Sequence, residues 1–244
     1  MQAETSHRDA MTHPEPLRGI SSMATRQVLA EMVLSFSAAT GLAVELESAG
    51  GVDVAQRVRA GETFDLVVLA ADAIDALIAA GLLQAGSRRA LVDSEVAVAV
   101  PVAASRPDIG SEQALQRSLL AARAIGYSTG PSGDALLRLF ERWGLAEQLR
   151  PQLVQARPGV PVGQLLAAGQ VDIGFQQLSE LMQQKGIALL GGMPPGLEIV
   201  TTFVGAVTTM SMRAAQAQAL LDYMARPDTA ALKQRHGMAA AASR

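Results

Sequence analysis

Residues 124–143 carry the clearest fold signal in the sequence: Ala-Ile-Gly-Tyr-Ser-Thr-Gly-Pro-Ser-Gly-Asp-Ala-Leu-Leu-Arg-Leu-Phe-Glu-Arg-Trp. The start of this stretch, Ala124–Tyr127, predicts a short strand, and Asp134–Trp143 predicts a helix. The turn between them is made of hydroxyl residues, two glycines and a proline, and glycine allows close backbone approach to a ligand. A helix that begins after a strand leaves unpaired N–H groups beside the positive end of its dipole. The stretch therefore predicts a βα unit whose junction can bind an anion.

Two earlier junctions have the same form. A strand is expected at 17–20, before Ser21 and Ser22, and a helix is expected at 24–40. A second strand is expected at 44–46, before Gly50 and Gly51, and a helix at 52–60. One such junction is an ordinary connection between a strand and a helix, whereas several that converge would form a site for a small anion.

The rest of the chain continues the alternation of strands and helices. Further strands are expected at 66–70, 95–100, 153–155, 173–176, 188–190 and 199–208. Further helices are expected at 73–80, 111–121, 146–150, 162–168, 178–182, 214–224 and 229–236, with Ser111 capping one helix and Asp72 another. Repeated βα units favour an α/β fold in which helices cover both faces of mainly parallel sheets.

Two long strands without a matching helix, Glu95–Val100 and Ile199–Thr208, are interpreted as crossings between two lobes. The predicted domains are a disordered tail at 1–16, a first lobe at 17–98 plus 204–244, and a second lobe at 99–203.

The composition narrows the function classes. The chain has 244 residues, 49% of them hydrophobic, which argues against global disorder. A net charge of −3, without a basic run, argues against nucleic-acid binding. The chain has no cysteine, and its histidines lie in the tail (His7, His13) or in the last expected helix (His236). We therefore expect no metal site, no cofactor and no hydrolase triad.

The N-terminal residues Met1–Glu15 are polar and lack the apolar core of a secretory signal. No run is long and apolar enough to cross a bilayer, so no membrane insertion is expected. We expect a cytoplasmic location for the chain as given, and a periplasmic one if a signal was removed.

The motifs occur in an order that resembles a known family. They are Ser21-Ser22, Gly50-Gly51, residues 64–70 (Phe-Asp-Leu-Val-Val-Leu-Ala), 126–133 (Gly-Tyr-Ser-Thr-Gly-Pro-Ser-Gly) and 172–177 (Asp-Ile-Gly-Phe-Gln-Gln). This order is similar to the molybdate-binding-protein-like branch of the type 2 periplasmic binding proteins, over nearly everything after about Leu17. The resemblance implies two α/β lobes, joined by two crossing strands, that close on a ligand. In the molybdate binders of that family, hydroxyls and backbone N–H groups hold the oxyanion without a cationic side chain.

The resemblance also implies ligand contacts at particular positions. They are Ser21 or Ser22, Gly50 or Gly51 (without the family's hydroxyl), Ser132, Val160, and Gln176 or Gln177 in place of the family's tyrosine. An amide in place of a phenol adds a hydrogen-bond acceptor. This change favours a ligand with carboxylate and hydroxyl or carboxylic-acid groups over a bare tetrahedral dianion. The aconitate isomerase subgroup of the same fold implies another activity, the movement of a double bond in a small tricarboxylic acid.

Several other residues have both a binding and a structural interpretation. Ser128, Ser132 and Gly133 belong to the most specific motif, and binding is favoured there, whereas Thr25 faces either the cleft or solvent. Arg157 can form a forked contact with a carboxylate or remain in solvent. Gln176 and Gln177 end a strand at its carboxyl side, where ligands bind in open α/β sheets.

Other residues are candidate acids or bases. Asp53 is a candidate base, although a carboxylate in the first turn of a helix is also favourable by itself. Tyr127 is a second candidate and Glu47 a third. Glu180 is either a proton carrier or a surface charge, and the surface interpretation is favoured.

The sequence thus predicts a binding protein that closes around a small anion, most simply an organic di- or tricarboxylate. An isomerase of unsaturated tricarboxylic acids and a carrier of molybdate or another oxyanion are the alternatives. A transporter permease is the expected partner if the protein is secreted.

Overall fold

The computed structural model describes residues 15–241. The predicted tail at 1–16 lies outside this range except for Glu15 and Pro16, whose backbone carbonyls accept hydrogen bonds from the Arg213 guanidinium. The end of the first lobe at 242–244 also lies outside the described residues.

All strands belong to one ten-stranded sheet with the order β2-β1-β3-β9-β4-β7-β5-β6, and β8 and β10 also pair with β4. The strands are β1 (Leu17–Ser22), β2 (Val44–Ala49), β3 (Leu66–Ala70), β4 (Arg89–Pro101), β5 (Ile125–Tyr127), β6 (Leu153–Gln155), β7 (Ile173–Gln177), β8 (Ile187–Gly192), β9 (Val200–Val207) and β10 (Met238–Ala240). The helices are α1 (Arg26–Thr40), α2 (Gly51–Arg59), α3 (Ala71–Ala79), α4 (Glu112–Ala121), α5 (Pro131–Arg142), α6 (Ala146–Leu149), α7 (Val162–Ala167), α8 (Leu178–Leu181), α9 (Ala214–Ala225) and α10 (Ala230–Arg235). Short 3₁₀ turns are η1 (Met23–Thr25), η2 (Ala85–Ser87), η3 (Arg150–Gln152) and η4 (Pro227–Thr229).

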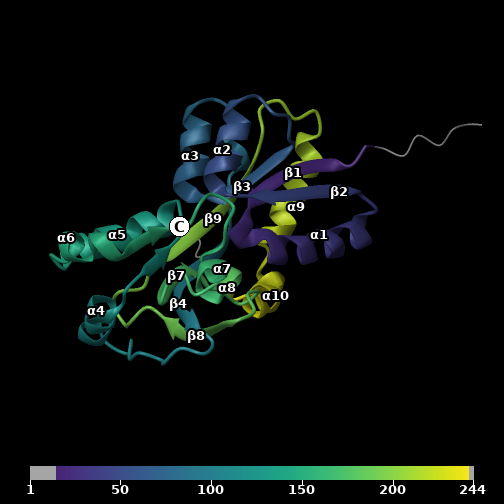
Figure 1. Cartoon of the computed structure of the whole chain (residues 1–244). Helices are drawn as coiled ribbons and strands as arrows, with labels where there is room; N and C mark the ends of the chain where they lie inside the picture. Colours follow the sequence, from purple (N-terminus) through teal and green to yellow (C-terminus); the bar gives the residue numbers. More distant parts are fainter. Residues whose placement is uncertain (1–14, 242–244) are drawn as a thin grey trace, which may run out of the picture.

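The long strand β4 divides this sheet into two halves (Figure 1). From Arg89 to Glu95 it pairs with β9, and from Val96 onward it pairs with β7 and β8. We call β1–β3, β9, β10 and their helices the first half, and β5–β8 and α4–α8 the second half. Pairing therefore places residues 96–98 in the second half and 200–203 in the first, a few residues from the predicted boundaries at 98 and 204.

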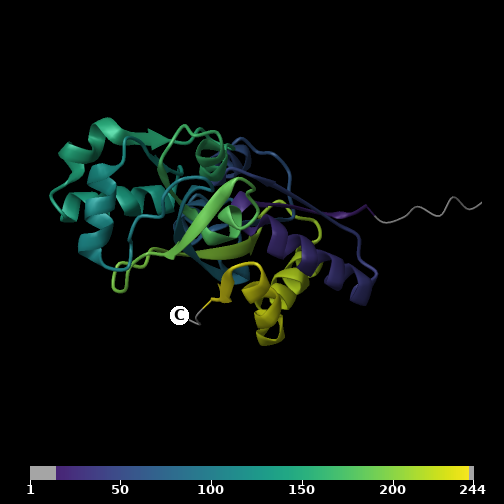
Figure 2. The same ribbon diagram turned by 60° about the horizontal axis from the view of Figure 1, so that its bottom comes forward.

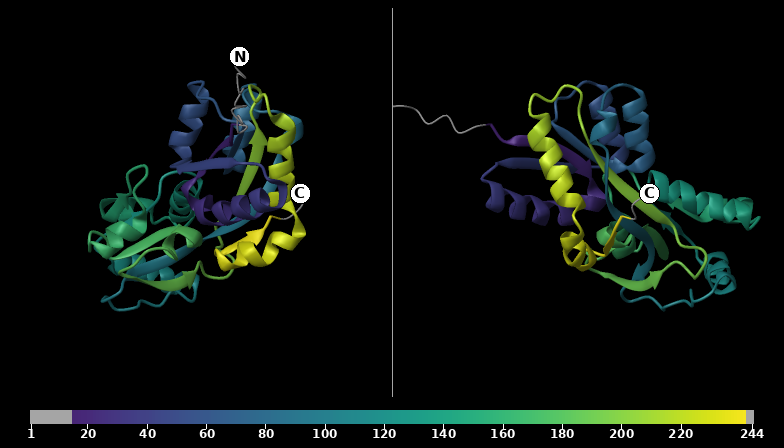
Figure 3. Two further views of the ribbon diagram at one scale, coloured as in Figure 1. Left: turned by 90° about the vertical axis from the view of Figure 1, so that its right-hand side faces the viewer. Right: turned by 180° about the vertical axis from the view of Figure 1, so that it is seen from behind.

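The first half has helices on both faces of its sheet. In the buried strand β3, Leu66 and Val68 pack on the side of α1 and α9, whereas Val67 and Leu69 pack on the side of α2 and α3. This alternation follows from the two-residue period of a strand. Figure 3, seen from behind, shows α1 and α9 together, away from α2 and α3.

The second half repeats this layering, and Figure 2 shows α4, α5 and α6, in teal, at the opposite end of the molecule from α1. Val96, Val98 and Val100 of β4 pack toward α4 and α5, and Ala97 and Ala99 pack toward α7 and α8. The small alanine side chains let these short helices approach the sheet closely. The structure thus confirms the α/β fold with two helix-covered parts.

Four local predictions need correction. The helix expected from Asp134 begins at Pro131, because proline is well suited to the first helical position, where its missing N–H costs nothing. Asp72 is inside α3 rather than at its cap, which is Ala70. A 3₁₀ turn separates Ser22 from α1, so the helix expected from Ala24 begins at Arg26. The strand β10 was not expected, since its residues have low strand propensity and depend on pairing with β4.

Candidate functional site

A cavity of about 300 Å³ lies between the two halves, at the carboxyl ends of β1, β3, β5 and β7. This is the edge of an open α/β sheet at which ligands bind, and the volume is at the lower end of the range for small-molecule sites. Its wall contains N-terminal residues of α2 and α5 from opposite halves. Both helices are thus oriented to place partial positive charge at the cavity.

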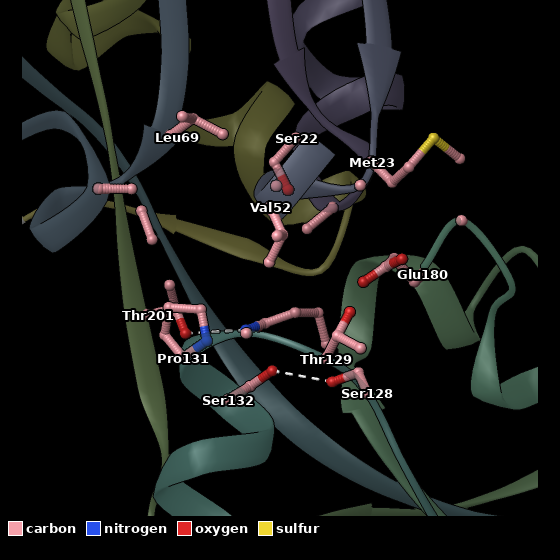
Figure 4. A pocket seen from close by; sticks show the side chains of 18 of the residues that line it. Ser22, Met23, Val52, Leu69, Ser128, Thr129, Pro131, Ser132, Glu180 and Thr201 are labelled. Atoms are coloured by element: carbon pink, nitrogen blue, oxygen red, sulfur yellow. Dashed lines mark hydrogen bonds between the residues drawn. The ribbon is translucent and has the colours of Figure 1, made fainter. Parts of the chain in front are cut away.

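The first half contributes the Ser22 hydroxyl and the start of α2. The Ser22 side chain makes no capping bond, and in Figure 4 it points into the cavity. A Cβ atom built on Gly51 would lie 3.8 Å from Ser22 Oγ, so the serine lies against the first turn of α2. Gly50 and Gly51 are both on the wall, where they expose backbone rather than side chains.

The second half contributes the turn between β5 and α5. The hydroxyls of Ser128 and Ser132 lie 3.0 Å apart and share a hydrogen bond (Figure 4). One of the two hydroxyls donates in that bond, and the other retains its hydrogen for a ligand. Thr129 and Pro131 lie on the same wall.

The two glutamines at the end of β7 differ in how their polar atoms are satisfied. The side-chain carbonyl oxygen of Gln176 accepts a 3.3 Å hydrogen bond from the backbone N–H of Gly163. Gln177 is 4% exposed, and its amide donates to the Thr201 hydroxyl at 2.8 Å. Its Oε1 atom is buried and has no partner among the described residues. A buried carbonyl without a donor is costly, so this oxygen is an unsatisfied acceptor in a residue of the cavity wall.

Glu180 faces the same cavity from α8 (Figure 4). The sequence favoured a surface charge for this residue, whereas the structure places it half-buried on the cavity wall. Burial raises the pKa of Glu180 to about 7, and a hydrogen bond from the Gln176 side chain opposes this rise only in part. Burial has this direction because it disfavours the charged form of a carboxyl.

Two guanidiniums also line the cavity. Arg157 lies in the loop after β6, and Arg59 ends α2. Both side chains are exposed, and neither forms an ion pair within the part of the chain that the structure describes. Arg59 was not expected from sequence, since its approach to the cavity depends on how α2 lies against the second half.

The predicted site residues fall into two groups. Those on the cavity wall are Ser22, Gly50, Gly51, Ser128, Ser132, Arg157, Val160, Gln176 and Gln177. Those away from it are Ser21, Thr25, Asp53, Tyr127 and Gly133.

The residues away from the wall have structural contacts that account for them. Ser21 is fully buried, and its hydroxyl bonds that of Ser48 at 2.8 Å. The Thr25 hydroxyl donates to the backbone carbonyl of Ser22. Asp53 lies in the first turn of α2, and Tyr127 packs against the core of the second half. Gly133 is required by close packing, since a Cβ atom there would lie 1.9 Å from the Ser128 carbonyl oxygen.

The described part of the chain has neither a cluster of metal ligands nor a membrane-spanning helix. Among residues 15–241, no group of three or more histidine, aspartate and glutamate side chains is arranged to hold a metal ion. No helix in this range has the length and apolarity needed to span a bilayer.

Comparisons with known proteins agree with this architecture. The family model for bacterial extracellular solute-binding proteins matches residues 17–239. The aconitate isomerase of a Pseudomonas species is 33% identical in an alignment of 219 residues, which covers 86% of this chain and 82% of that protein. The chain therefore belongs to the bacterial extracellular solute-binding protein family, and the resemblance to molybdate-binding-like proteins is confirmed.

Solved structures share the whole fold. The periplasmic molybdate-binding protein of Azotobacter vinelandii has a TM-score of 0.76 and 20% identity, over 93% of this chain and 100% of that one. The sulfate-binding protein of Mycobacterium tuberculosis has a TM-score of 0.73 and 17% identity, over 92% of this chain and 86% of that one.

Proposed function

We propose that this solute-binding protein takes up a small organic di- or tricarboxylate in the cavity between its two halves. The observation that supports this most is that neutral donors from both halves line one cavity together with two guanidiniums that form no ion pair among residues 15–241. Helix N-termini and hydroxyls suit one carboxylate, and Arg59 and Arg157 can each form a forked contact with another.

The remaining polar groups favour an organic acid over a bare oxyanion. The unpartnered carbonyl of Gln177 needs a donor, which an organic acid supplies through a hydroxyl or a protonated carboxyl. The Glu180 carboxylate repels a compact dianion such as molybdate, because all of the negative charge of such a ligand would lie close to it. Molybdate and sulfate have no carbon skeleton to cover the apolar part of the wall, which includes Leu69 and Phe203.

Thermal-shift and calorimetric titrations with citrate, cis- and trans-aconitate, sulfate and molybdate test the proposal. We expect the organic acids to stabilise the protein most, and Arg157→Ala and Arg59→Ala to weaken their binding by about ten-fold each. Arg138→Ala is the matched control, since Arg138 is also exposed and lies outside the cavity wall. Greatest stabilisation by molybdate or sulfate would contradict carboxylate binding.

A second candidate function is isomerisation of an unsaturated tricarboxylate of the aconitate kind. It is supported by the 33% identical aconitate isomerase, which this chain matches over most of its length, and by the acid group at the cavity. Proton NMR of purified protein with cis- or trans-aconitate tests it directly. We expect one isomer to convert into the other. Tight binding without conversion would contradict the isomerase function and would agree with carboxylate binding alone.

For location and partner, we propose the periplasm and the permease of a transporter. The family's extracellular description supports this choice over the cytoplasmic alternative. Fractionation of the native host, followed by immunoblotting, separates the two, since recovery only with cytoplasmic markers would contradict it.

A further inference from the structure

We propose that Glu180 is the catalytic residue that removes and returns the proton when the cavity isomerises an unsaturated acid. This inference rests on the second function proposed above. Of the described residues on the cavity wall, Glu180 alone carries an acidic side chain. Asp53, Tyr127 and Glu47, the other candidates from sequence, lie outside this wall.

The surroundings of Glu180 hold its carboxyl in place. The side chain of Gln176 lies beside the carboxyl and lowers its pKa, and the side-chain carbonyl of Gln176 accepts a hydrogen bond from the N–H of Gly163. The neighbouring Ser179 hydroxyl donates to the Ala24 carbonyl of the first half, which fixes α8 beside η1. The carboxyl is therefore presented to a ligand that both halves enclose, as required for proton transfer at a fixed position.

The charges around the cavity suit a base that works near neutral pH. Burial raises the pKa of Glu180 to about 7, and the proton affinity of a good general base is matched to the working pH. The charged groups that face the cavity with it are Arg59 from α2 and Arg157 from the loop after β6. The starts of α2 and α5 add partial positive charge from the two halves.

The proposed reaction is a shift of a double bond without any redox change. The Glu180 carboxylate takes a proton from the CH₂ carbon of aconitate, which lies next to a carboxylate and is allylic to the double bond. The C–H electron pair forms a new double bond to the central carbon, and the old π electrons move onto the former vinyl carbon and its carboxylate. Hydroxyls, N–H groups and guanidiniums stabilise this charge. The Glu180 O–H then gives the proton to the former vinyl carbon, which becomes the new CH₂.

Isomerisation and hydrogen exchange in D₂O, followed by proton NMR, test this role. We expect Glu180→Gln to lower the turnover number and the exchange of the CH₂ protons by at least about a hundred-fold, while aconitate still raises the melting temperature. We expect kcat/KM of the unmodified protein to fall below pH 7, where Glu180 is protonated, and this acid limb to disappear from any residual activity of the variant. Glu141→Gln, at an exposed position of α5 outside the cavity wall, should behave as the unmodified protein.

The possible contradictions separate the two proposals. If the unmodified protein isomerises aconitate and Glu180→Gln retains its rate within three-fold, the role of Glu180 is overturned and the isomerase function stands. If the unmodified protein binds aconitate without isomerisation or exchange, the role of Glu180 and the isomerase function are overturned, and carboxylate binding stands. Should Glu180→Gln fail to fold, Glu180→Asp takes its place, because it keeps a carboxyl group. The fall of kcat/KM below pH 7 in the unmodified protein then tests the role of Glu180, and its absence would contradict that role.

Discussion

The Ser179 hydroxyl of α8 donates a 2.9 Å hydrogen bond to the backbone carbonyl of Ala24 in η1, and so joins the two halves beside the cavity. Both residues are buried. The halves also approach each other where a Cβ atom on Gly50 would lie 3.5 Å from the backbone nitrogen of Gly159. The two halves are therefore in direct contact beside the cavity, and a hinge motion that separates them is the expected route of ligand entry.

We predict that Ser179→Ala shifts the ligand-free protein toward an open arrangement. The change removes about 1 kcal/mol of net stabilisation and leaves the Ala24 carbonyl without its donor unless the halves separate. Small-angle X-ray scattering should show a larger radius of gyration for the variant without ligand, and a return to the original value with ligand. Ser35→Ala is the control, because its hydroxyl bonds only within α1. Identical scattering by all three proteins would show that this bond does not hold the halves together.

We predict that Gly133→Ala destabilises the protein by about 3 kcal/mol. The new methyl group would meet the Ser128 carbonyl oxygen, and backbone must move to make room. The motion would also displace the hydroxyl pair of Ser128 and Ser132, so we expect weaker ligand binding. Urea denaturation measures the first effect and calorimetry the second. Gly86→Ala, at a position with no atom within 4 Å of the new methyl, should change the stability little.

Much of the fold could be predicted from the sequence because local signals and tertiary structure agree. The buried strand Leu66–Ala70 has the predicted bounds, since a continuous apolar run is typical of a strand covered on both faces. Ser111 caps α4, and its hydroxyl accepts a hydrogen bond from the Ala114 N–H, as predicted from its position just before the expected helix. The junctions at the carboxyl ends of the strands also converge at one cavity.

The parts that could not be predicted depend on contacts between distant residues. Glu180 reaches the cavity wall from α8, which docks on η1, more than 150 residues earlier in the chain. Arg59 and Arg157 meet at one cavity from opposite halves. Lys233 is 1% exposed, although nothing in the sequence around it marks a buried position. No local pattern in a single sequence records such distances.

We predict that Gln177→Met changes the ligand-free stability by less than about 1 kcal/mol and lowers ligand affinity at least ten-fold. The substitution loses the bond to Thr201, and it also removes a buried carbonyl that has no donor, so the two effects offset each other. Affinity falls because the acceptor for the ligand is gone. Urea denaturation and calorimetry measure the two effects.

Gln176→Met is the matched comparison for Gln177→Met. Its side chain bonds the Gly163 N–H and Glu180, so its loss should destabilise the ligand-free protein. A large loss of stability in Gln177→Met, with affinity unchanged, would contradict the role given to the unpartnered carbonyl.

We predict that Glu180 makes the ligand-free protein less stable as the pH rises through neutrality. Its pKa is about 7 in the folded protein against an ordinary value of 4.5, so the folded state holds the proton more tightly than the unfolded state. The neutral carboxyl therefore contributes its full stability below about pH 4.5, and this contribution is lost as the pH approaches and passes 7. One pKa unit corresponds to about 1.4 kcal/mol, which gives an upper limit of about 3 kcal/mol.

Glu180→Gln isolates this contribution, since glutamine stays neutral at every pH. The difference in free energy of unfolding between the two proteins should move by up to about 3 kcal/mol in favour of Glu180→Gln from pH 4.5 to pH 8. Asp172 and Glu31, whose pKa values are lowered by hydrogen bonds from Arg123 and from His236 and Arg235, affect both proteins alike and cancel. Urea denaturation across this range makes the measurement. Parallel curves would show that the carboxyl ionises as freely in the folded protein as in water, and would remove the physical basis for a base that works near pH 7.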